Sequence, residues 1–231
     1  MPSTQSGREF VAYALFIGAL ELIPEGRKLK SGRLSPYFFN AGLFYTAEAT
    51  NHLAMSYAST IARADENDEL VPDVIFGPAY KGIAIAVSTA SMLRFEFVGY
   101  DKIAWAHDRK EEKDHGDGGV LVGAPLTEKR VIIVDDVITD GASKRTAVDR
   151  IRGAGGTPVA CVIAFDRQER GADPKDDRPS AVRFSEEFEI PVLAAATLED
   201  LIQVLEEGPD FPKAAKTLPK ILAYKDQYGV R

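Results

Sequence analysis

The sequence predicts an α/β fold in which helices flank a mainly parallel central sheet. Short apolar runs such as DVIF and VIIV alternate along the chain with longer segments of helical periodicity. Apolar runs of this length are typical of strands buried on both faces, as in a parallel sheet between two helical layers. The 231 residues, 45% of them hydrophobic, suffice for one core, or for one core with a small subdomain.

The first part of the chain predicts two helices and one aromatic strand. Residues 10–20 (FVAYALFIGAL) predict an N-terminal helix that continues to Leu20, followed by a loop rich in Gly, Lys and Ser. Residues 35–44 (SPYFFNAGLF) predict a short strand or hairpin because of their aromatic run. Residues 47–64 predict a helix with one apolar face.

The remainder predicts strands and helices in alternation, which is the pattern that builds a parallel sheet. Residues 172–185 are polar and predict an exposed segment to which no function is assigned. In order, the predicted elements are a strand in PDVIFGPA (72–79), a helix in KGIAIAVSTASML (81–93), two strands in FEFVGYDKIAWAH (95–107), a strand in RVIIVDDVITDG (130–141), a helix in ASKRTAVDRIRGAG (142–155), a strand in TPVACVIAFDR (157–167), and a strand, turn and helix in IPVLAAATLEDLIQVLEEG (190–208).

Composition argues against nucleic-acid and membrane partners. The formal net charge is −7, whereas binding to nucleic acid or to an anionic membrane requires a basic surface. Residues 10–20 are too short to span a bilayer and follow Glu9 rather than a basic segment, so we expect no signal peptide. The single cysteine, Cys161, cannot form an internal disulfide and suits a reducing compartment. We therefore expect a cytoplasmic protein.

The strongest chemical signal is residues 131–143 (VIIVDDVITDGAS). An apolar strand ends in Asp135 and Asp136, and a loop then opens a helix. Two carboxylates at a strand tip can accept hydrogen bonds from neighbouring sugar hydroxyls, and a loop at a helix N-terminus can bind a phosphate through its N–H groups. Gly141 allows the backbone to approach such a ligand closely. The segment predicts a phosphosugar site at the carboxyl edge of the sheet, where ligands bind in such folds.

The residues alone leave two other interpretations of this segment open. The two acids could cap the following helix, or they could bind Mg²⁺ in a nucleotide triphosphatase. The absence of a GxxxxGK[ST] loop from the sequence weakens the second interpretation.

Residues 131–143 resemble the phosphoribosyl-diphosphate (PRPP) motif of the type I phosphoribosyltransferases, which has an apolar strand, two acids, two apolar residues and a phosphate loop. Further segments resemble the orotate-specific branch of that family, in the expected order and over nearly the whole chain. They are LKSGRLSPYFFNAG (29–42), GPAYKG (77–82), RKEEKDHGDGG (109–119), FDRQERG (165–171) and AYKDQYGV (223–230).

The resemblance implies a type I phosphoribosyltransferase-like fold, formed by residues 1–231 as one domain. About residues 1–45 would form a small N-terminal subdomain, the hood, which contributes to the base pocket. The implied reaction transfers the 5-phosphoribosyl group from PRPP to orotate and releases pyrophosphate, in pyrimidine biosynthesis, with Mg²⁺ as cofactor.

The base pocket implied by the resemblance contains Phe38, Phe39, Thr139 and Arg167 as orotate-binding residues. Orotate is a flat, carboxylated pyrimidine, so aromatic faces and a guanidinium that pairs with a carboxylate suit it chemically. The two phenylalanines could instead be core aromatics. Thr139 is expected to contact both ligands, where base and ribose meet.

The resemblance assigns most of the remaining polar residues of these segments to PRPP. Lys30 could reach a phosphate or the base carboxylate, although an exposed lysine is the ordinary alternative. The implied PRPP-binding residues are Lys30, Tyr80, Lys81, Arg109, Lys110, Lys113, His115, Asp135, Asp136, Val137, Ile138, Thr139, Asp140, Gly141, Ala142 and Ser143.

Residues 109–119 are charged and glycine-rich, which predicts a loop rather than a packed element. From composition this loop could simply be an exposed surface loop. The resemblance implies that the loop, at residues 108–119, closes over pyrophosphate, typically in the active site of a neighbouring subunit, so that a homodimer is the functional unit.

The implied mechanism is displacement at the anomeric carbon through an oxocarbenium-like transition state. The implied catalytic residues are Arg109, Lys113, His115, Asp135 and Asp136. Lys113 and His115 would offset charge on the departing pyrophosphate, while the two aspartates hold the ribose. Mg²⁺ would be held mainly by PRPP, with Asp135 and Asp136 able to contact it through water, and no direct protein ligand is assigned.

The phosphate loop departs from the family pattern, which commonly reads Thr-Ala-Gly-Thr-Ala. Here it reads TDGAS, so that Asp140 adds a negative charge and Ala142 lacks the usual hydroxyl. Ser143 could supply that hydroxyl from the next position. The departure bears on the side-chain contacts to the 5′-phosphate and leaves the backbone N–H donors unaffected.

Three rival functions are consistent with parts of the sequence. A phosphoribosyltransferase for a purine or for uracil would share residues 131–141 but would not explain SPYFFN or RKEEKDH. A nucleic-acid-binding regulator built on this fold would need a basic face or an added domain. A bifunctional enzyme that also decarboxylates the product would need a second domain, for which 231 residues leave no room.

Overall fold

The computed structural model describes residues 3–65, 70–113, 119–138, 141–171, 176–208 and 211–230, without the side chains of residues 112 and 113. The strands are β1 (Leu20–Lys28), β2 (Leu34–Phe39), β3 (Val74–Gly77), β4 (Ala104–Lys113), β5 (Gly119–Gly123), β6 (Arg130–Asp135), β7 (Thr157–Asp166) and β8 (Val192–Thr197). The helices are α1 (Gln5–Phe16), the 3-10 turn η1 (Ala41–Leu43), α2 (Ala47–Asp65), α3 (Lys81–Glu96), α4 (Ala142–Gly153), α5 (Ser180–Phe188), α6 (Leu198–Glu207) and α7 (Ala214–Tyr228).

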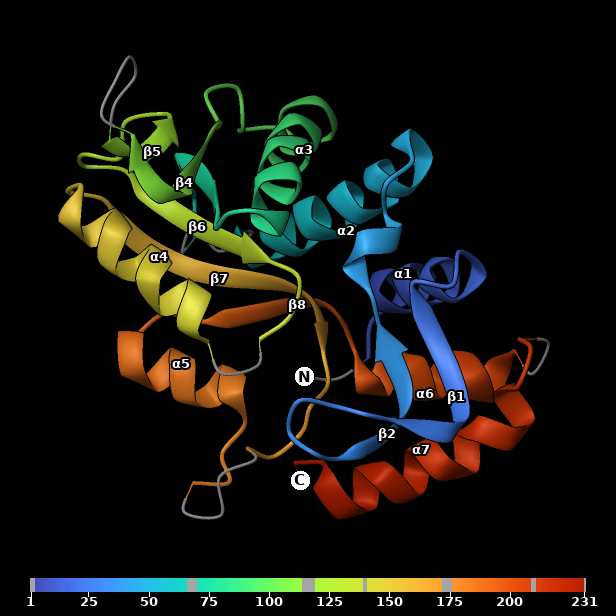
Figure 1. Cartoon of the computed structure of the whole chain (residues 1–231). Coiled ribbons are helices and arrows are strands. Elements are labelled where there is room, and N and C mark those ends of the chain that lie inside the picture. The colour runs from blue at the N-terminus through green and yellow to red at the C-terminus, as the bar shows by residue number, and fades with distance from the viewer. Residues whose placement is uncertain are drawn as a thin grey trace.

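The central sheet has the strand order β5-β4-β3-β6-β7-β8, and a separate hairpin pairs β1 with β2 (Figure 1). Strands β3, β4, β6, β7 and β8 are parallel, whereas β5 is antiparallel to β4. The predicted α/β fold with a mainly parallel sheet is therefore confirmed. In the part of the chain that the structure describes, no helix combines the length and apolar character needed to cross a bilayer.

Alternate residues of β6 face two hydrophobic cores on opposite sides of the sheet. Ile132 and Val134 lie in a core with residues of α1, α2 and α3, whereas Val131 and Ile133 lie in a second core with residues of α4 and α5. The side chains of a strand point alternately to its two faces. A run of four apolar residues is consequently buried on both sides, as the sequence predicted.

The N-terminal hairpin and the C-terminal helix α7 pack side by side (Figure 1). The ring of Tyr37 in β2 meets the ring of Tyr224 in α7 edge-on, with centroids 6.2 Å apart. Phe39 stacks on Phe165 of β7 at 5.7 Å, which fixes the hairpin against the central sheet. The hairpin thus lies near the carboxyl ends of the strands.

The first helix ends earlier than its apolar pattern predicted. Helix α1 ends at Phe16, and β1 begins at Leu20, where a continuing helix and then a loop were expected. Gly18 adopts φ 73°, a left-handed conformation that glycine allows and that ends helices. The apolar residues beyond Gly18 form the first part of β1.

Two other predictions about elements were wrong in part. The segment FEFVGYDKIAWAH forms one strand rather than two, because Phe95 and Glu96 still belong to α3. Residues 109–113 were expected in a loop, yet they extend β4, whose Lys113 pairs with Gly119 of β5. Residues 114–118 lie outside the described residues. Cross-strand pairing, which the local composition does not reveal, accounts for the longer strand.

Candidate active site

The carboxyl ends of β3, β6 and β7 lie next to one another in the sheet. The two predicted acids are at the end of β6. Lys81, the first residue of α3, places its Nζ 2.8 Å from Oδ2 of Asp136. This ion pair joins the helix after β3 to the end of β6. The Lys81 side chain remains 60% exposed, so its ammonium group is accessible to a ligand.

Asp135 is engaged within the protein. Its Oδ2 accepts hydrogen bonds from Nζ of Lys144 and, at 3.1 Å, from Oγ of Ser143, while its Oδ1 accepts from the N–H of Asp136 at 2.9 Å. Tyr57 donates to the backbone oxygen of Asp135 at 2.7 Å. Burial is the largest cause that raises the pKa of Tyr57 well above its usual range, so the phenol stays a neutral donor.

Asp136 is the more accessible of the two acids. Its Oδ1 accepts the N–H of Val137 at 2.8 Å, and its Oδ2 faces Lys81. The two aspartates therefore differ in role. Asp135 fixes the start of α4 against β6, whereas Asp136 lies beside a partly exposed cation.

The predicted phosphate loop leads into α4. Gly141 precedes the helix with φ 76°, and Ala142 and Ser143 form its first turn. The first N–H groups of a helix lack intrahelical acceptors, which favours anions at this end. Val137 and Ile138 are partly buried and pack against the two different cores. Thr139 and Asp140 lie outside the described residues.

The turn between β3 and α3 is set by close backbone contact. A Cβ on Gly77 would lie 1.9 Å from the carbonyl oxygen of Gly82, so no side chain fits there. Asp108 of β4 accepts the N–H of Ala79 at 2.6 Å and an ion pair from Arg150 of α4. The peptide bond that follows, Ala79–Tyr80, is cis.

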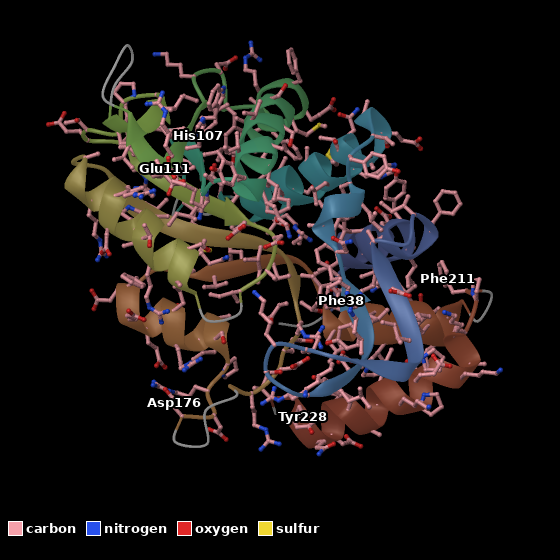
Figure 2. The ribbon with its side chains drawn as sticks, in the orientation of Figure 1. Phe38, His107, Glu111, Asp176, Phe211 and Tyr228 are labelled. Atoms are coloured by element: carbon pink, nitrogen blue, oxygen red, sulfur yellow. The ribbon has the colours of Figure 1, made fainter. Side chains whose placement is uncertain are left out.

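The turn exposes Tyr80, whose side chain is 73% exposed at the N-terminus of α3. Tyr80 and Lys81 thus lie together at the start of α3, next to the end of β3. On the neighbouring β4, Arg109 donates to the carbonyl of Gly119 at 3.0 Å, and Lys110 is exposed. Figure 2 shows Glu111 on the same strand. The side chains of Lys113 and His115 lie outside the described residues.

The two predicted base-pocket phenylalanines point to opposite faces of β2. Phe39 is 9% exposed and belongs to the main core, where it stacks on Phe165. Phe38 is partly exposed, and the guanidinium of Arg27 lies 3.9 Å from its ring centroid (Figure 2). Phe38 is accordingly the one that can offer a face to a ligand. Lys30 is exposed in the turn of the hairpin.

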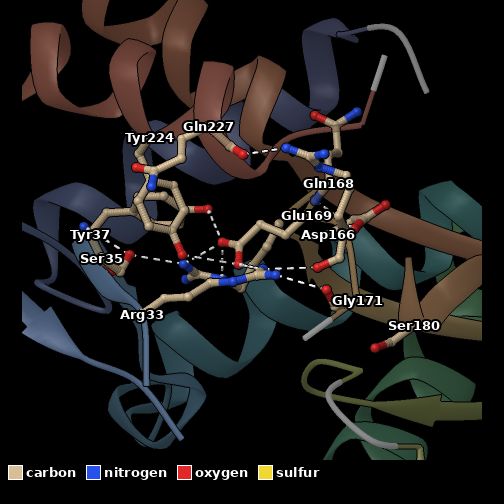
Figure 3. A network of polar contacts seen from close by, with 12 residues as sticks. Arg33, Ser35, Tyr37, Asp166, Gln168, Glu169, Gly171, Ser180, Tyr224 and Gln227 are labelled. Carbon is tan, nitrogen blue, oxygen red and sulfur yellow. Dashed lines mark hydrogen bonds and ion pairs between the residues drawn. The ribbon is translucent and has the colours of Figure 1, made fainter. Parts of the chain in front are cut away.

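Arg167 directly follows β7 and contacts Glu169, which lies within the network of polar contacts in Figure 3. Its Nε lies 2.7 Å from Oε1 of Glu169, and its Nη2 donates to Oγ of Ser35 at 2.8 Å. Burial by itself would lower the pKa of Arg167, but Tyr37 and Glu169 raise it above its usual range. The guanidinium therefore stays charged beside the hairpin.

The described residues contain no group of three or more His, Cys, Asp or Glu side chains that could hold a metal ion directly. Each carboxylate oxygen of Asp135 and Asp136 already accepts a hydrogen bond or ion pair. The donor set fits an ion carried mainly by the ligand.

Sequence reasoning missed several residues that shape this site: Ser35, Asp108, Lys144, Arg150 and Glu169. Lys144 had a detectable signal, because it lies at helical spacing with the buried Ala147, Val148 and Ile151. A lysine on the apolar side of a helix requires a buried partner. The other four act through contacts between distant parts of the chain, which a single sequence does not display.

Comparison with known proteins assigns the family. Residues 47–192 match the model of the phosphoribosyl transferase domain. The chain is 44% identical over 229 residues to an orotate phosphoribosyltransferase of Bordetella avium, covering 98% of this chain and 100% of the relative. It is 48% identical over 203 residues to one from Marinobacter nauticus, covering 87% of this chain and 89% of the relative.

Solved structures agree with this assignment. The crystal structure of an orotate phosphoribosyltransferase from Francisella tularensis superposes with a TM-score of 0.80 at 33% identity, covering 96% of this chain and 100% of that one. The match spans the sheet, the hairpin and the terminal helices together. The chain belongs to the type I phosphoribosyltransferase family and, within it, to the orotate phosphoribosyltransferases.

Proposed function

We propose that this enzyme transfers the 5-phosphoribosyl group of PRPP to orotate, forming orotidine 5′-monophosphate and pyrophosphate in pyrimidine biosynthesis. The observation that carries the proposal is the adjacency of two different sets of residues at one edge of the sheet. Asp136 and the start of α4 follow β6, and Arg167 follows the neighbouring β7 beside the hairpin that carries Phe38. A phosphosugar and a carboxylated base can therefore bind side by side.

On the sugar side, the start of α4 binds the 5′-phosphate through backbone N–H groups, including that of Ser143. Asp136, the more accessible acid, accepts hydrogen bonds from the ribose hydroxyls. Its negative charge also favours the positive charge that develops on the ribose ring as the bond to pyrophosphate breaks. Asp135 holds this arrangement in place through Ser143 and Lys144.

On the leaving-group side, Tyr80 and Lys81 bind the diphosphate from the turn after β3. Arg109, Lys110, Lys113 and His115 neutralise charge on the departing pyrophosphate. Closure of residues 108–119 over the site excludes water, which would otherwise hydrolyse the activated sugar. Replacing Lys113 by Ala should lower kcat far more than it raises the KM for orotate, and equal losses in both would contradict this division of roles.

On the base side, Phe38 borders the pyrimidine ring and Arg167 pairs with its carboxylate. Thr139 is expected to contact both the base and the ribose. Phe39 packs against Phe165 in the core and so anchors β2, the strand that also carries Phe38. No protein nucleophile is needed, because a ring nitrogen of orotate attacks the anomeric carbon directly.

Magnesium would be carried mainly by PRPP, and Asp135 and Asp136 would be able to hold it through water. When bound, it neutralises negative charge on the leaving diphosphate. The donor set described above fits such an indirect role.

The functional unit is a homodimer in the cytoplasm, with residues 108–119 of each subunit reaching the neighbouring active site. Mixing inactive Lys113→Ala and Asp136→Asn subunits tests this arrangement, since shared sites would restore part of the activity in hybrid dimers. Absence of any recovery in verified hybrids would show that each site is complete within one chain.

The reaction itself is tested by mixing the protein with PRPP, Mg²⁺ and orotate, and following the loss of orotate absorbance. Uracil, hypoxanthine and adenine serve as parallel substrates. Consumption of orotate alone supports the proposal. Turnover of another base instead would retain the PRPP site but refute the base pocket at Phe38 and Arg167.

A further inference from the structure

The carboxylate of Glu169 accepts contacts from four side chains (Figure 3). On Oε1 it receives Nε of Arg167 at 2.7 Å and the hydroxyl of Tyr37 at 3.3 Å. On Oε2 it receives Nη1 of Arg33 at 3.2 Å and the hydroxyl of Tyr224 at 3.0 Å. The Glu169 side chain is only 11% exposed, so these contacts replace most of its hydration.

These four partners come from three separate parts of the chain. Arg33 and Tyr37 belong to the hairpin, Arg167 follows β7, and Tyr224 lies in α7. Arg33 also donates to the carbonyls of Arg170 and Gly171, at 2.8 Å each. Glu169 therefore holds the segment that carries Arg167 against the hairpin that carries Phe38.

The network also determines which part of Arg167 remains for a ligand. Its Nε contacts Glu169, and its Nη2 contacts both Glu169, at 2.6 Å, and Ser35. Within the described part of the chain, the contacts with Glu169 and Ser35 do not use Nη1, although the hydroxyl of Tyr224 also lies close to the guanidinium. The guanidinium plane is further fixed over the ring of Tyr37, 4.2 Å from its centroid.

Charge within this network favours an anion. Arg33 and Arg167 bring two positive charges to the single negative charge of Glu169, while Tyr37 and Tyr224 are neutral donors. Burial is the main cause that raises the pKa of Tyr224 to about 12, so the phenol keeps its proton at neutral pH. The Arg167 side chain is 19% exposed, so part of its guanidinium remains accessible to a ligand.

We infer that Glu169 is a positioning residue for the base: it fixes Arg167 so that Nη1 meets the carboxylate of orotate, and it locks this geometry to the hairpin that bears Phe38. The inference rests on the proposed function, because it assumes that Arg167 binds orotate. Glu169 thus determines which nitrogen of Arg167 meets the substrate, although Glu169 itself does not touch the substrate.

The test compares steady-state kinetics of Glu169→Gln, Arg167→Ala and Glu199→Gln with those of the unchanged enzyme. Gln keeps the shape of Glu169 but removes its charge. We expect the KM for orotate to rise by about tenfold, as for a loss of about 1.4 kcal/mol in binding. The KM for PRPP and the kcat should stay within about threefold, since less than about 0.7 kcal/mol is then involved.

Glu199→Gln is the matched control. Glu199 pairs with Lys225 and so ties α6 to the same helix, α7, that carries Tyr224, whereas its side chain has no hydrogen bond or ion pair with Arg167. Its loss should leave both KM values unchanged. Thermal unfolding of all variants separates a local effect on orotate from a general loss of stability.

Equal rises in both KM values for Glu169→Gln, or no rise in either, would overturn the inference. If Arg167→Ala leaves the KM for orotate unchanged, the proposed base pocket itself fails. If Arg167→Ala raises it and Glu169→Gln does not, only the positioning role fails. Should Glu169→Gln not fold, Tyr224→Phe replaces it. A selective rise of about threefold in the orotate KM, about 0.7 kcal/mol, then supports the inference, and no selective rise overturns it.

Discussion

The ammonium group of Lys144 lies against the carboxylate of Asp135 inside the protein, where the two residues are 3% and 8% exposed. The pair joins the first turn of α4 to the end of β6. Asp135 also accepts the hydroxyl of Ser143 at 3.1 Å. One of the two acids thereby holds α4 against β6, whereas its neighbour Asp136 is the more accessible of the two.

Replacing Lys144 by Met should destabilise the protein by about 3 to 5 kcal/mol, because it leaves a buried carboxylate without its cation. Urea unfolding measures this loss. Lys129→Met is the control, since Lys129 and its partner Asp73 are about half exposed, at 44% and 40%. It should cost no more than about 1 kcal/mol. Similar losses of unfolding free energy in the two variants would show that burial does not strengthen the effect of losing Lys144.

Adding a methyl group at Gly77 should abolish PRPP binding or folding. The new Cβ would lie 1.9 Å from the carbonyl oxygen of Gly82, so the turn that carries Tyr80 must move. Gly153→Ala is the control, because a Cβ there meets nothing within 4 Å. In the last turn of α4, alanine should be neutral or stabilising by up to about 1 kcal/mol. Calorimetric titration with PRPP gives the readout, and normal binding by Gly77→Ala would refute the steric argument.

Asp108→Ala should weaken both the fold and the binding of PRPP. It leaves the N–H of Ala79 without its acceptor and Arg150 without its carboxylate partner. Loss of such a charged, buried acceptor costs roughly 2 to 3 kcal/mol. Asp101→Ala removes the exposed partner of Arg94 and should have little effect. Unfolding curves and the KM for PRPP report the outcome, and an unchanged KM would confine Asp108 to a stabilising role.

Cys161 should not react with thiol reagents in the folded protein at pH 8. It is fully buried in β7, and burial is the main cause that raises its pKa to about 12. Because the folded pKa lies above the unfolded value of 9.0, the stability that the neutral thiol contributes is complete below pH 9 and is lost as the pH rises toward 12. Ellman's reagent should detect one thiol per chain only after denaturation; rapid reaction before it would contradict the buried position.

The sequence predicted the central architecture because its signals are local. The apolar run of β6 predicts a buried strand, and the glycines at the two ends of α4 predict where that helix begins and ends; each signal lies within a few residues of the chain. The end of α1 was misplaced because apolar residues continue past Gly18 into β1. Helix α5 was not predicted, since Ser180 to Phe188 follow a polar segment and bury only Phe184 within the helix.

The sequence predicted those candidate site residues that belong to local motifs, but not the residues that contact them. Asp136 and Arg167 directly follow strands, and Lys81 begins the helix after β3, as expected, but their partners come from distant segments. Arg33 and Glu169 are 136 positions apart in sequence, and Tyr224 and Glu169 are 55 apart. A single sequence gives no sign of which residues come into contact over such separations. The division of roles between Phe38 and Phe39 likewise depends on which face of β2 meets the core.

The most direct test of the account is the ratio of kcat/KM for orotate to that for uracil, measured in the unchanged enzyme and in Arg167→Ala. Uracil lacks only the carboxylate, so a site built to bind that group should prefer orotate by roughly 10⁴-fold. We predict this preference for orotate in the unchanged enzyme, and we predict that it largely disappears in Arg167→Ala. Comparable use of both bases by the unchanged enzyme, or an undiminished preference in the variant, would contradict the assignment of Arg167 to orotate.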